Sequence, residues 1–94
     1  MRRLEIIRVR NSGTPRRQLM DEVRRSSAGL AHRVEVRLYR HAGLVTDLGV
    51  HLHLDAQATD PAVAELGARL AAALSEHGMV EHTVWLEEQA AEGS

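Results

Sequence analysis

Two histidines that lie two residues apart are the side chains with the most evident chemistry in this sequence. His51, His53 and Asp55 alternate with aliphatic residues at positions 50, 52 and 54. A period of two is typical of a β-strand that has one face in an apolar core. The strand therefore projects two imidazoles and a carboxylate on one side, and that side is where we look for function.

General-base chemistry is the first use that this pair of imidazoles allows. A neutral histidine can accept a proton near neutral pH. With Tyr39 and Arg37 on the preceding strand, either imidazole could deprotonate a bound phenol while the guanidinium holds the anion. Trp85 could stack on the ring of such a ligand. The catalytic hypothesis names His51, His53, Tyr39 and Arg37, the ligand-binding hypothesis names Trp85 and Arg37, and neither requires a cofactor.

Metal binding is the alternative use of the same pair. His51 and His53, about 7 Å apart at Cα on one face of a strand, can ligate a divalent metal such as nickel or zinc. Asp55 or Glu81 could add a further ligand. The pattern is similar to the ligand strand of nickel-responsive repressors, whose cysteine ligand this chain lacks. A third interpretation gives both imidazoles a structural role, hydrogen-bonded within an interface.

Composition narrows the remaining classes. The 94 residues fit one small domain, 1–94, with a frayed tail at 89–94. The absence of cysteine and lysine excludes thiolate, Schiff-base and P-loop chemistry. No apolar run approaches the ~20 residues of a membrane helix, so we expect a cytoplasmic protein without membrane contact.

The charges are unevenly distributed along the chain. Residues 1–40 hold eleven arginines and four acidic residues, a net of +7, whereas residues 41–94 hold one arginine and nine acidic residues, a net of −8. A basic half can bind nucleic acid or another anion. We expect instead that the two halves neutralise each other across neighbouring strands.

Six elements can be predicted along the chain. Alternating patterns indicate strands at 4–10, 32–40, 48–55 and 79–87. Thr14-Pro15 and Asp60-Pro61 are helix-start signals, and Gly78 is expected to be a left-handed cap after the second helix. The order βαββαβ with right-handed crossovers predicts a ferredoxin-like α+β sandwich, with an antiparallel sheet ordered 4-1-3-2 and both helices on one face.

The second face of this sheet would carry Arg37, Tyr39, His51, His53 and Trp85, together with either Leu4 and Ile6 or Ile7 and Val9. Tyr39 and Trp85 are the only aromatic residues of the chain. We therefore expect a second protomer to cover this face, giving a homodimeric α+β barrel. RNA-recognition domains share the element order but carry aromatic residues on their central strands. The segments 4–10 and 48–55 have none, so we expect no nucleic-acid partner.

The element order and two segments of the sequence, 36–41 (VRLYRH) and 46–53 (TDLGVHLH), carry a resemblance. Together they resemble the dimeric α+β barrel superfamily, which includes the antibiotic-biosynthesis monooxygenase-like proteins. Members range from cofactor-independent oxygenases and haem degraders to uncharacterised proteins. The resemblance implies a homodimer with a small-molecule cavity on the sheet face. Whether the chain is an enzyme, a metal-binding module or a structural dimer stays open at this point.

Overall fold

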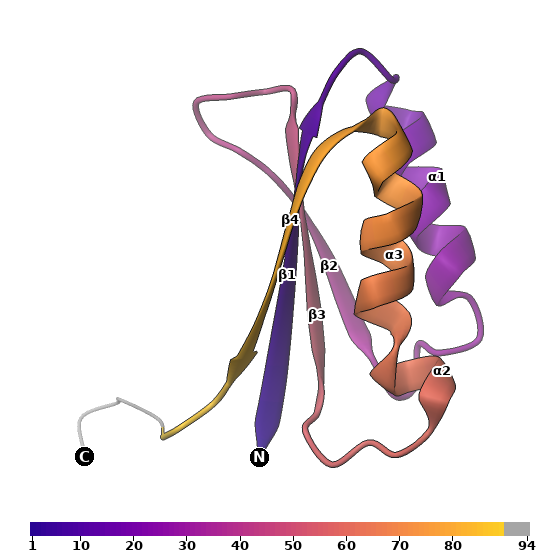
Figure 1. Ribbon diagram of the computed structural model, residues 1–94, viewed down its shortest axis with the longest axis vertical. Helices are drawn as coiled ribbons and strands as arrows, with labels where there is room; N and C mark the ends of the chain where they lie inside the picture. Colours follow the sequence, from indigo (N-terminus) through magenta and orange to yellow (C-terminus); the bar gives the residue numbers. More distant parts are fainter. Residues whose placement is uncertain (90–94) are drawn as a thin grey trace.

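The computed structural model describes residues 1–89 and forms two layers, a sheet and a pair of helices (Figure 1). Residues 90–94, most of the predicted frayed tail, lie outside the described residues. No helix in the described part is long and apolar enough to cross a membrane. The elements are β1 (Arg2–Asn11), α1 (Arg16–Ser27), β2 (Glu35–Arg40), β3 (Asp47–Asp55), α2 (Pro61–Ala64), α3 (Leu66–Leu74), the 3₁₀ turn η1 (Ser75–His77) and β4 (Gly78–Leu86).

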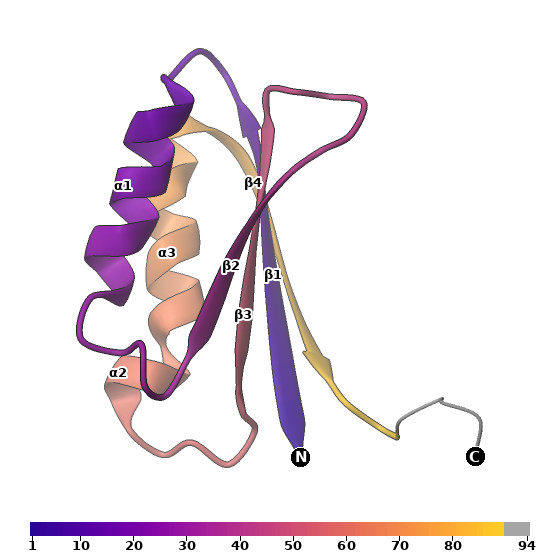
Figure 2. The ribbon, with the colours of Figure 1, turned by 180° about the vertical axis from the view of Figure 1, so that it is seen from behind.

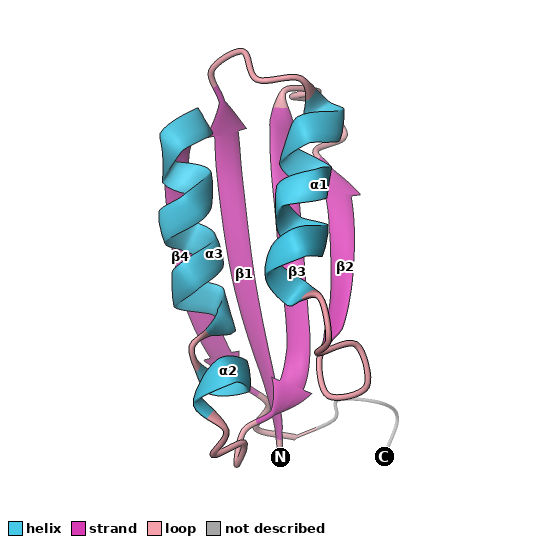
Figure 3. Ribbon diagram, turned by 90° about the vertical axis from the view of Figure 1, so that its right-hand side faces the viewer, coloured by secondary structure: helices cyan, strands magenta, loops and turns pink. Residues whose placement is uncertain are grey.

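The sheet has the order β2-β3-β1-β4, and every neighbouring pair is antiparallel. Helices α1 and α3 lie side by side over one face (Figure 3). Seen from both sides, the opposite face carries no helix of the described chain (Figure 2). We call this opposite face the open face. The predicted ferredoxin-like fold, strand order and helix placement are confirmed.

The core lies between the sheet and the helices. Alternate residues of the central strands point into it, and the apolar stripes of α1 and α3 close it from the other side. Strand β1 contributes Ile7 and Val9 to the core. Of the two pairs considered for the second face of the sheet, it is therefore Leu4 and Ile6 that lie on the open face. The buried apolar residues are Ile7, Val9, Leu19, Val23, Leu30, Val34, Leu48, Val50, Leu52, Leu54, Val63, Leu66, Leu70 and Leu74.

The two helix-start signals have different outcomes. Asp60 caps α2 as predicted, because its side chain accepts a hydrogen bond from the Ala62 amide at 2.9 Å. The Thr14 prediction was wrong, because α1 begins at Arg16 and has no side-chain cap. The Thr14 hydroxyl instead contacts Nδ1 of His77 at 2.9 Å. A tertiary contact with η1 has thus taken the polar group that the local pattern assigned to a cap.

The second predicted helix, from 61 to about 77, is divided into α2, α3 and η1. The break falls at Glu65, whose backbone has φ −101° and ψ 1°. Arg69 donates a hydrogen bond at 2.9 Å to the Ala62 carbonyl beside the break. The apolar stripe nevertheless continues across it, because Val63 and Leu66 are both buried.

Gly78 is not the left-handed cap that was predicted. Its φ of 160° is extended, and the residue begins β4. A Cβ at this position would lie 2.0 Å from the Arg10 carbonyl oxygen. Glycine is needed there because β4 starts in close contact with the backbone of β1.

The predicted neutralisation between the two halves is found at particular pairs. Arg8 on β1 bonds Asp47 on the neighbouring strand β3, as expected. Arg33 and Asp60 also join the basic half to the acidic half, but both lie outside the strands. Other arginines pair within the basic half, as Arg24 does with Asp21. The expected neutralisation therefore accounts for part of the charge pattern.

A carboxylate is buried in the helix-facing side of the sheet. Glu5 is 1% exposed, and its two oxygens contact His82 Nε2 at 2.7 Å and Arg3 Nη2 at 2.9 Å. A buried charge is tolerated when it is paired in this way. Gly67 of α3 makes room for it, because a Cβ there would lie 1.9 Å from Glu5 Oε1.

Gly67→Ala should therefore destabilise the protein by about 1–3 kcal/mol, although the same change in a helix ordinarily stabilises by roughly 0.5–1 kcal/mol. Urea unfolding followed by circular dichroism measures the free energy of unfolding. The double variant Glu5→Ala/Gly67→Ala is the control, and it should be no less stable than Glu5→Ala alone. An increase in stability for Gly67→Ala would contradict this account of the buried carboxylate.

Candidate functional site

All five residues proposed for chemistry lie on strand positions that face the open side. The register pairs His51 with Ile6 and Arg37, and pairs His53 with Leu4 and Glu35. Directly opposed residues in an antiparallel sheet project on the same face. Trp85 of β4 is opposite Leu4 of β1, which is itself opposite His53 of β3. Trp85 and His53 therefore project on the same face. Their sharing of one face follows from the register, whereas their roles stay predictions.

A hollow lies on this face over Gly49. Its volume is about 180 Å³, and Ile6, Arg8, Tyr39 and His51 contribute to its lining. Gly49 lies between Arg8 on one neighbouring strand and Tyr39 on the other. Because glycine has no side chain, the space between the Arg8 and Tyr39 side chains is left empty. A Cβ at Gly49 would meet only ordinary contacts, at 3.6 Å or more. The glycine thus leaves an open floor that a larger residue would fill. We call this the Gly49 hollow.

His51 forms one wall of the Gly49 hollow and is in contact with Tyr39. The two ring centroids are 4.4 Å apart, at an interplanar angle of 45°. Partial burial lowers the pKa of His51 below its ordinary value, and the neighbouring His53 lowers the pKa further. Both effects disfavour the imidazolium. Burial and His53 thus both favour the neutral imidazole, which is the form that a general base requires.

His53 and Trp85 belong to a second hollow, about 400 Å³ in volume, near the N-terminal end of β1. Leu4 lies between them in the register. Trp85 is 58% exposed, and its indole N–H donates a hydrogen bond to the Thr83 hydroxyl at 2.9 Å. The predicted residues thus divide between two hollows, with Tyr39 and His51 in one and His53 and Trp85 in the other.

Arg37 is on the predicted face but is engaged locally. Its Nη2 lies 2.5 Å from Glu35 Oε1, and its Nε donates to the same oxygen at 2.7 Å. This pairing raises the pKa of Arg37 and lowers the pKa of Glu35. Arg37 does not line the Gly49 hollow.

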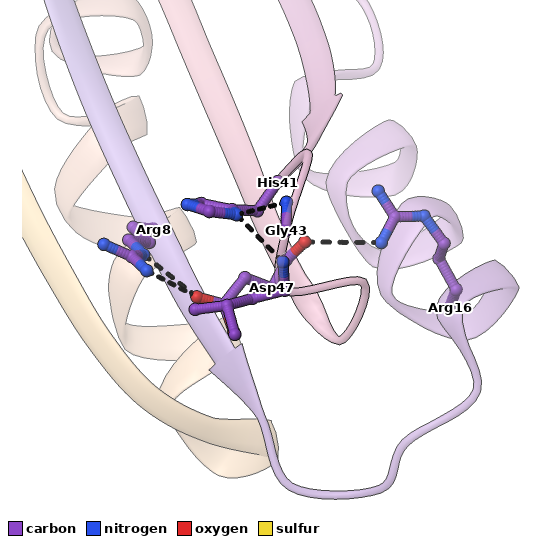
Figure 4. Close-up of polar contacts among 6 residues, drawn as sticks. Arg8, Arg16, His41, Gly43 and Asp47 are labelled. Atoms are coloured by element: carbon purple, nitrogen blue, oxygen red, sulfur yellow. Dashed lines mark hydrogen bonds and ion pairs between the residues drawn. The ribbon is translucent and has the colours of Figure 1, made fainter.

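Sequence reasoning did not single out the ion pair that borders the Gly49 hollow. Asp47 Oδ2 accepts hydrogen bonds from Arg8 Nε at 3.1 Å and Arg8 Nη2 at 2.7 Å (Figure 4). Asp47 is 2% exposed, and Arg8 holds the pKa of this carboxyl below its ordinary value. The sequence pattern that could have pointed to Arg8 is the alternation along β1, because Ile6, Arg8 and Arg10 are two residues apart and so share one face.

The loop between β2 and β3 adjoins the same hollow and projects away from the helices (Figures 1 and 2). Nδ1 of His41 accepts hydrogen bonds from the Gly43 and Leu44 amides at 3.0 and 2.9 Å. Arg16 reaches from α1 and donates to the carbonyls of Tyr39, Val45 and Asp47. Figure 4 shows the loop between these side chains. These contacts hold the loop that leads into β3 at Asp47.

The metal hypothesis gains no further ligand from the described part of the chain. The rings of His51 and His53 are 6.5 Å apart, centroid to centroid. Within residues 1–89, no His, Asp or Glu joins the pair to make a group of three. Asp55 is engaged with the Gln57 amide, and Glu81 lies on β4, two strands away from β3. Metal binding by the pair stays a prediction.

The ferredoxin-like fold is shared with solved structures that include antibiotic-biosynthesis monooxygenase-like proteins, in agreement with the resemblance seen in the sequence. A variant of SnoaB, a cofactor-independent oxygenase from Streptomyces nogalater, superposes with a TM-score of 0.71 at 21% identity and covers 97% of both chains. Rv0793 from Mycobacterium tuberculosis superposes with a TM-score of 0.66 at 18% identity, over 98% of this chain and all of its own.

A third neighbour is a candidate antibiotic biosynthesis monooxygenase from Chloroflexus aurantiacus J-10-fl, with a TM-score of 0.61 at 7% identity, over 96% of this chain and 98% of that one. No protein-family profile and no curated protein sequence matches the chain. At these identities the likeness establishes the fold, and the reaction must be argued from the residues of this chain.

The titration of His51 tests the geometry of this site. Its imidazole should protonate below the ordinary value of about 6.5, and His53→Ala should raise the midpoint only partway, since burial remains. Because the unfolded chain then binds the proton more readily, this group lowers stability as the pH falls from about 6.5 to the folded-state pKa. Proton NMR of the imidazole resonances measures the midpoint. His77→Ala, in η1 and away from the open face, should leave the midpoint unchanged. A midpoint at or above 6.5 would contradict the description.

Proposed function

We propose that the protein binds an electron-rich aromatic small molecule in the Gly49 hollow and oxygenates it without a cofactor, as a homodimeric barrel. The observation that carries the proposal is that His51 lines a hollow whose floor is a glycine, with its pKa lowered by burial so that the neutral imidazole is favoured. Tyr39, tilted against His51, offers a ring and a hydroxyl beside the bound molecule. The likeness in fold to SnoaB, described as a cofactor-independent oxygenase, supports the same class of reaction.

The chemistry requires that the substrate itself supplies the electrons. A phenol whose ring system also contains a CH₂ group can lose a proton to His51 and become an electron-rich anion. Reaction with O₂ converts the CH₂ to a carbonyl: one oxygen atom enters the product, and the other leaves as water with the two hydrogens. The four electrons that O₂ accepts all come from that carbon. The contributions of the protein are proton transfer, orientation and exclusion of water.

His51→Ala should lower kcat/KM for oxygenation by roughly 10²–10⁴, the usual contribution of a general base. An oxygen electrode, with fused-ring hydroxylated anthrones as substrates, measures O₂ uptake by metal-stripped protein. His32→Ala, which removes an exposed imidazole near the start of β2, is the matched control and should keep full activity. No uptake by the unaltered protein with any of these substrates would contradict the oxygenase proposal, and an active His51→Ala variant would contradict the role of His51.

The homodimer in this proposal is supported by the character of the open face. Leu4 and Ile6 form an apolar centre, while Trp85 is 58% and Met79 is 75% exposed at its side. Exposed large apolar side chains on one face of a small protein are typical of an interaction site. A second copy over this face would enclose both hollows, which a single sheet leaves open to solvent.

Trp85→Arg should therefore convert a dimer into a monomer, because it places a charge in the proposed interface. Ala72→Arg, on the exposed side of α3, adds the same charge elsewhere and should leave the dimer intact. Sedimentation velocity at micromolar concentration measures the mass of each species. A monomeric unaltered protein would contradict the barrel.

A further inference from the structure

One edge of the Arg8 guanidinium, at the border of the Gly49 hollow, makes no hydrogen bond within residues 1–89. Nε and Nη2 both bond to one oxygen of Asp47. These two nitrogens form the side edge of the planar group, so the end edge keeps Nη1 and the second hydrogen of Nη2. Within residues 1–89, Nη1 makes no hydrogen bond, and the Arg8 side chain is 37% exposed.

Asp47 holds this guanidinium in one orientation. The carboxylate is buried, and two charge-assisted hydrogen bonds join it to Arg8. Its own position is set by the loop contacts, since Arg16 donates to the Asp47 carbonyl at 3.4 Å. A guanidinium with one edge fixed by a carboxylate has lost most of its side-chain freedom before a ligand arrives, which lowers the entropic cost of binding.

The end edge of an arginine is a fork of N–H donors suited to an oxyanion. Arg8 lines the Gly49 hollow together with Tyr39 and His51, so this fork and the neutral imidazole border the same space. Glu81, opposite Arg8 on β4, makes no hydrogen bond with it. The titratable and charged groups that line the hollow are Arg8 on β1, Tyr39 and Arg40 on β2, His41 in the loop, and Asp47 and His51 on β3. Arg10, opposite Asp47 in the register, is a further charge beside it.

We propose that the Gly49 hollow binds its ligand as an oxyanion, a phenolate or enolate whose oxygen lies on the end edge of Arg8, and that Asp47 is a positioning residue for that arginine. The inference rests on the proposed function and names the ionic form of its substrate. It assigns to Arg8 the anion-binding role that sequence reasoning gave to Arg37, which is engaged with Glu35. The proton leaves toward His51, and the resulting negative charge is held by Arg8.

The probe for this inference is 4-nitrophenol, which ionises near neutral pH and whose phenolate absorbs visible light. Bound to the unaltered protein, it should ionise at a pH at least one unit lower than in water, because the phenolate then binds tenfold or more tightly than the phenol. Absorbance titration across pH at saturating protein measures this midpoint directly. If the role of Arg8 were purely structural, the bound probe would ionise at the same pH as in water.

The variant Arg8→Gln/Asp47→Asn removes both charges together, so that no unpaired carboxylate is left buried. It should keep the fold and return the midpoint of the bound probe to its value in water. Arg10→Gln is the matched control, because it removes the next arginine on the same face of β1, and it should retain the lowered midpoint. Asp47→Asn alone should lose part of the shift, since Arg8 keeps its charge but not its orientation.

A lowered midpoint that persists in Arg8→Gln/Asp47→Asn would overturn the inference. Gly49→Leu separates this failure from failure of the site itself, because a side chain there fills the floor of the hollow. If the probe does not bind, or binds Gly49→Leu as well as the unaltered protein, the proposed site and the inference both fail. If binding depends on Gly49 but the bound probe ionises as in water, the site stands and only the role of Arg8 is overturned.

Discussion

The pairing of β3 with β1 is the constraint on which the rest of the structure depends. Nine residue pairs, from Arg2 opposite Asp55 to Arg10 opposite Asp47, fix the two central strands against each other. Because side chains alternate along a strand, a shift of one residue would exchange the core face for the open face. The same register that buries Val50 and Leu52 therefore places Gly49 opposite Arg8 and His51 opposite Ile6.

The polar residues on the two faces serve different ends. Glu5 is enclosed by Arg3 and His82 against α3, where its charge is neutralised and out of reach of a ligand. Arg8 also pairs with a buried carboxylate, but only one edge of its guanidinium is used. The charge of Glu5 is paired with Arg3 and His82, although Oε2 has no hydrogen-bond partner in the described part of the chain. Arg8, in contrast, keeps the end edge of its guanidinium beside the Gly49 hollow, where it is open to a ligand.

Much of the fold could be predicted because its signals are local. The alternation at 48–55 and the Asp60-Pro61 start are both found in the structure, and they led to the correct strand order. The orientation of β1 could not be predicted, since both of its faces carry aliphatic residues and Glu5 occupies the buried one. Thr14 and Gly78 were misassigned because their partners, His77 and Arg10, are distant in the sequence.

The candidate site was predictable only as a face. Alternation placed Tyr39, His51 and Trp85 on one side of the sheet, but it could not show that they divide between two hollows. Asp47 was expected to lie in a connection, and its burial depends on Arg8, which lies 39 residues earlier. The hollow arises because Gly49 has no side chain. A glycine in a strand does not reveal, from the sequence alone, whether the side chains of neighbouring strands fill the space beside it.

The central claim is that a small aromatic molecule binds over Gly49. Amide NMR spectra recorded during titration with 2-naphthol test it most directly, because each backbone amide reports on its own surroundings. The account predicts that chemical-shift changes are largest at Gly49 and its neighbours Tyr39, Val50 and His51, and saturate with one ligand per chain. Changes centred on Trp85 and Leu86, or no saturable change on the open face, would contradict it.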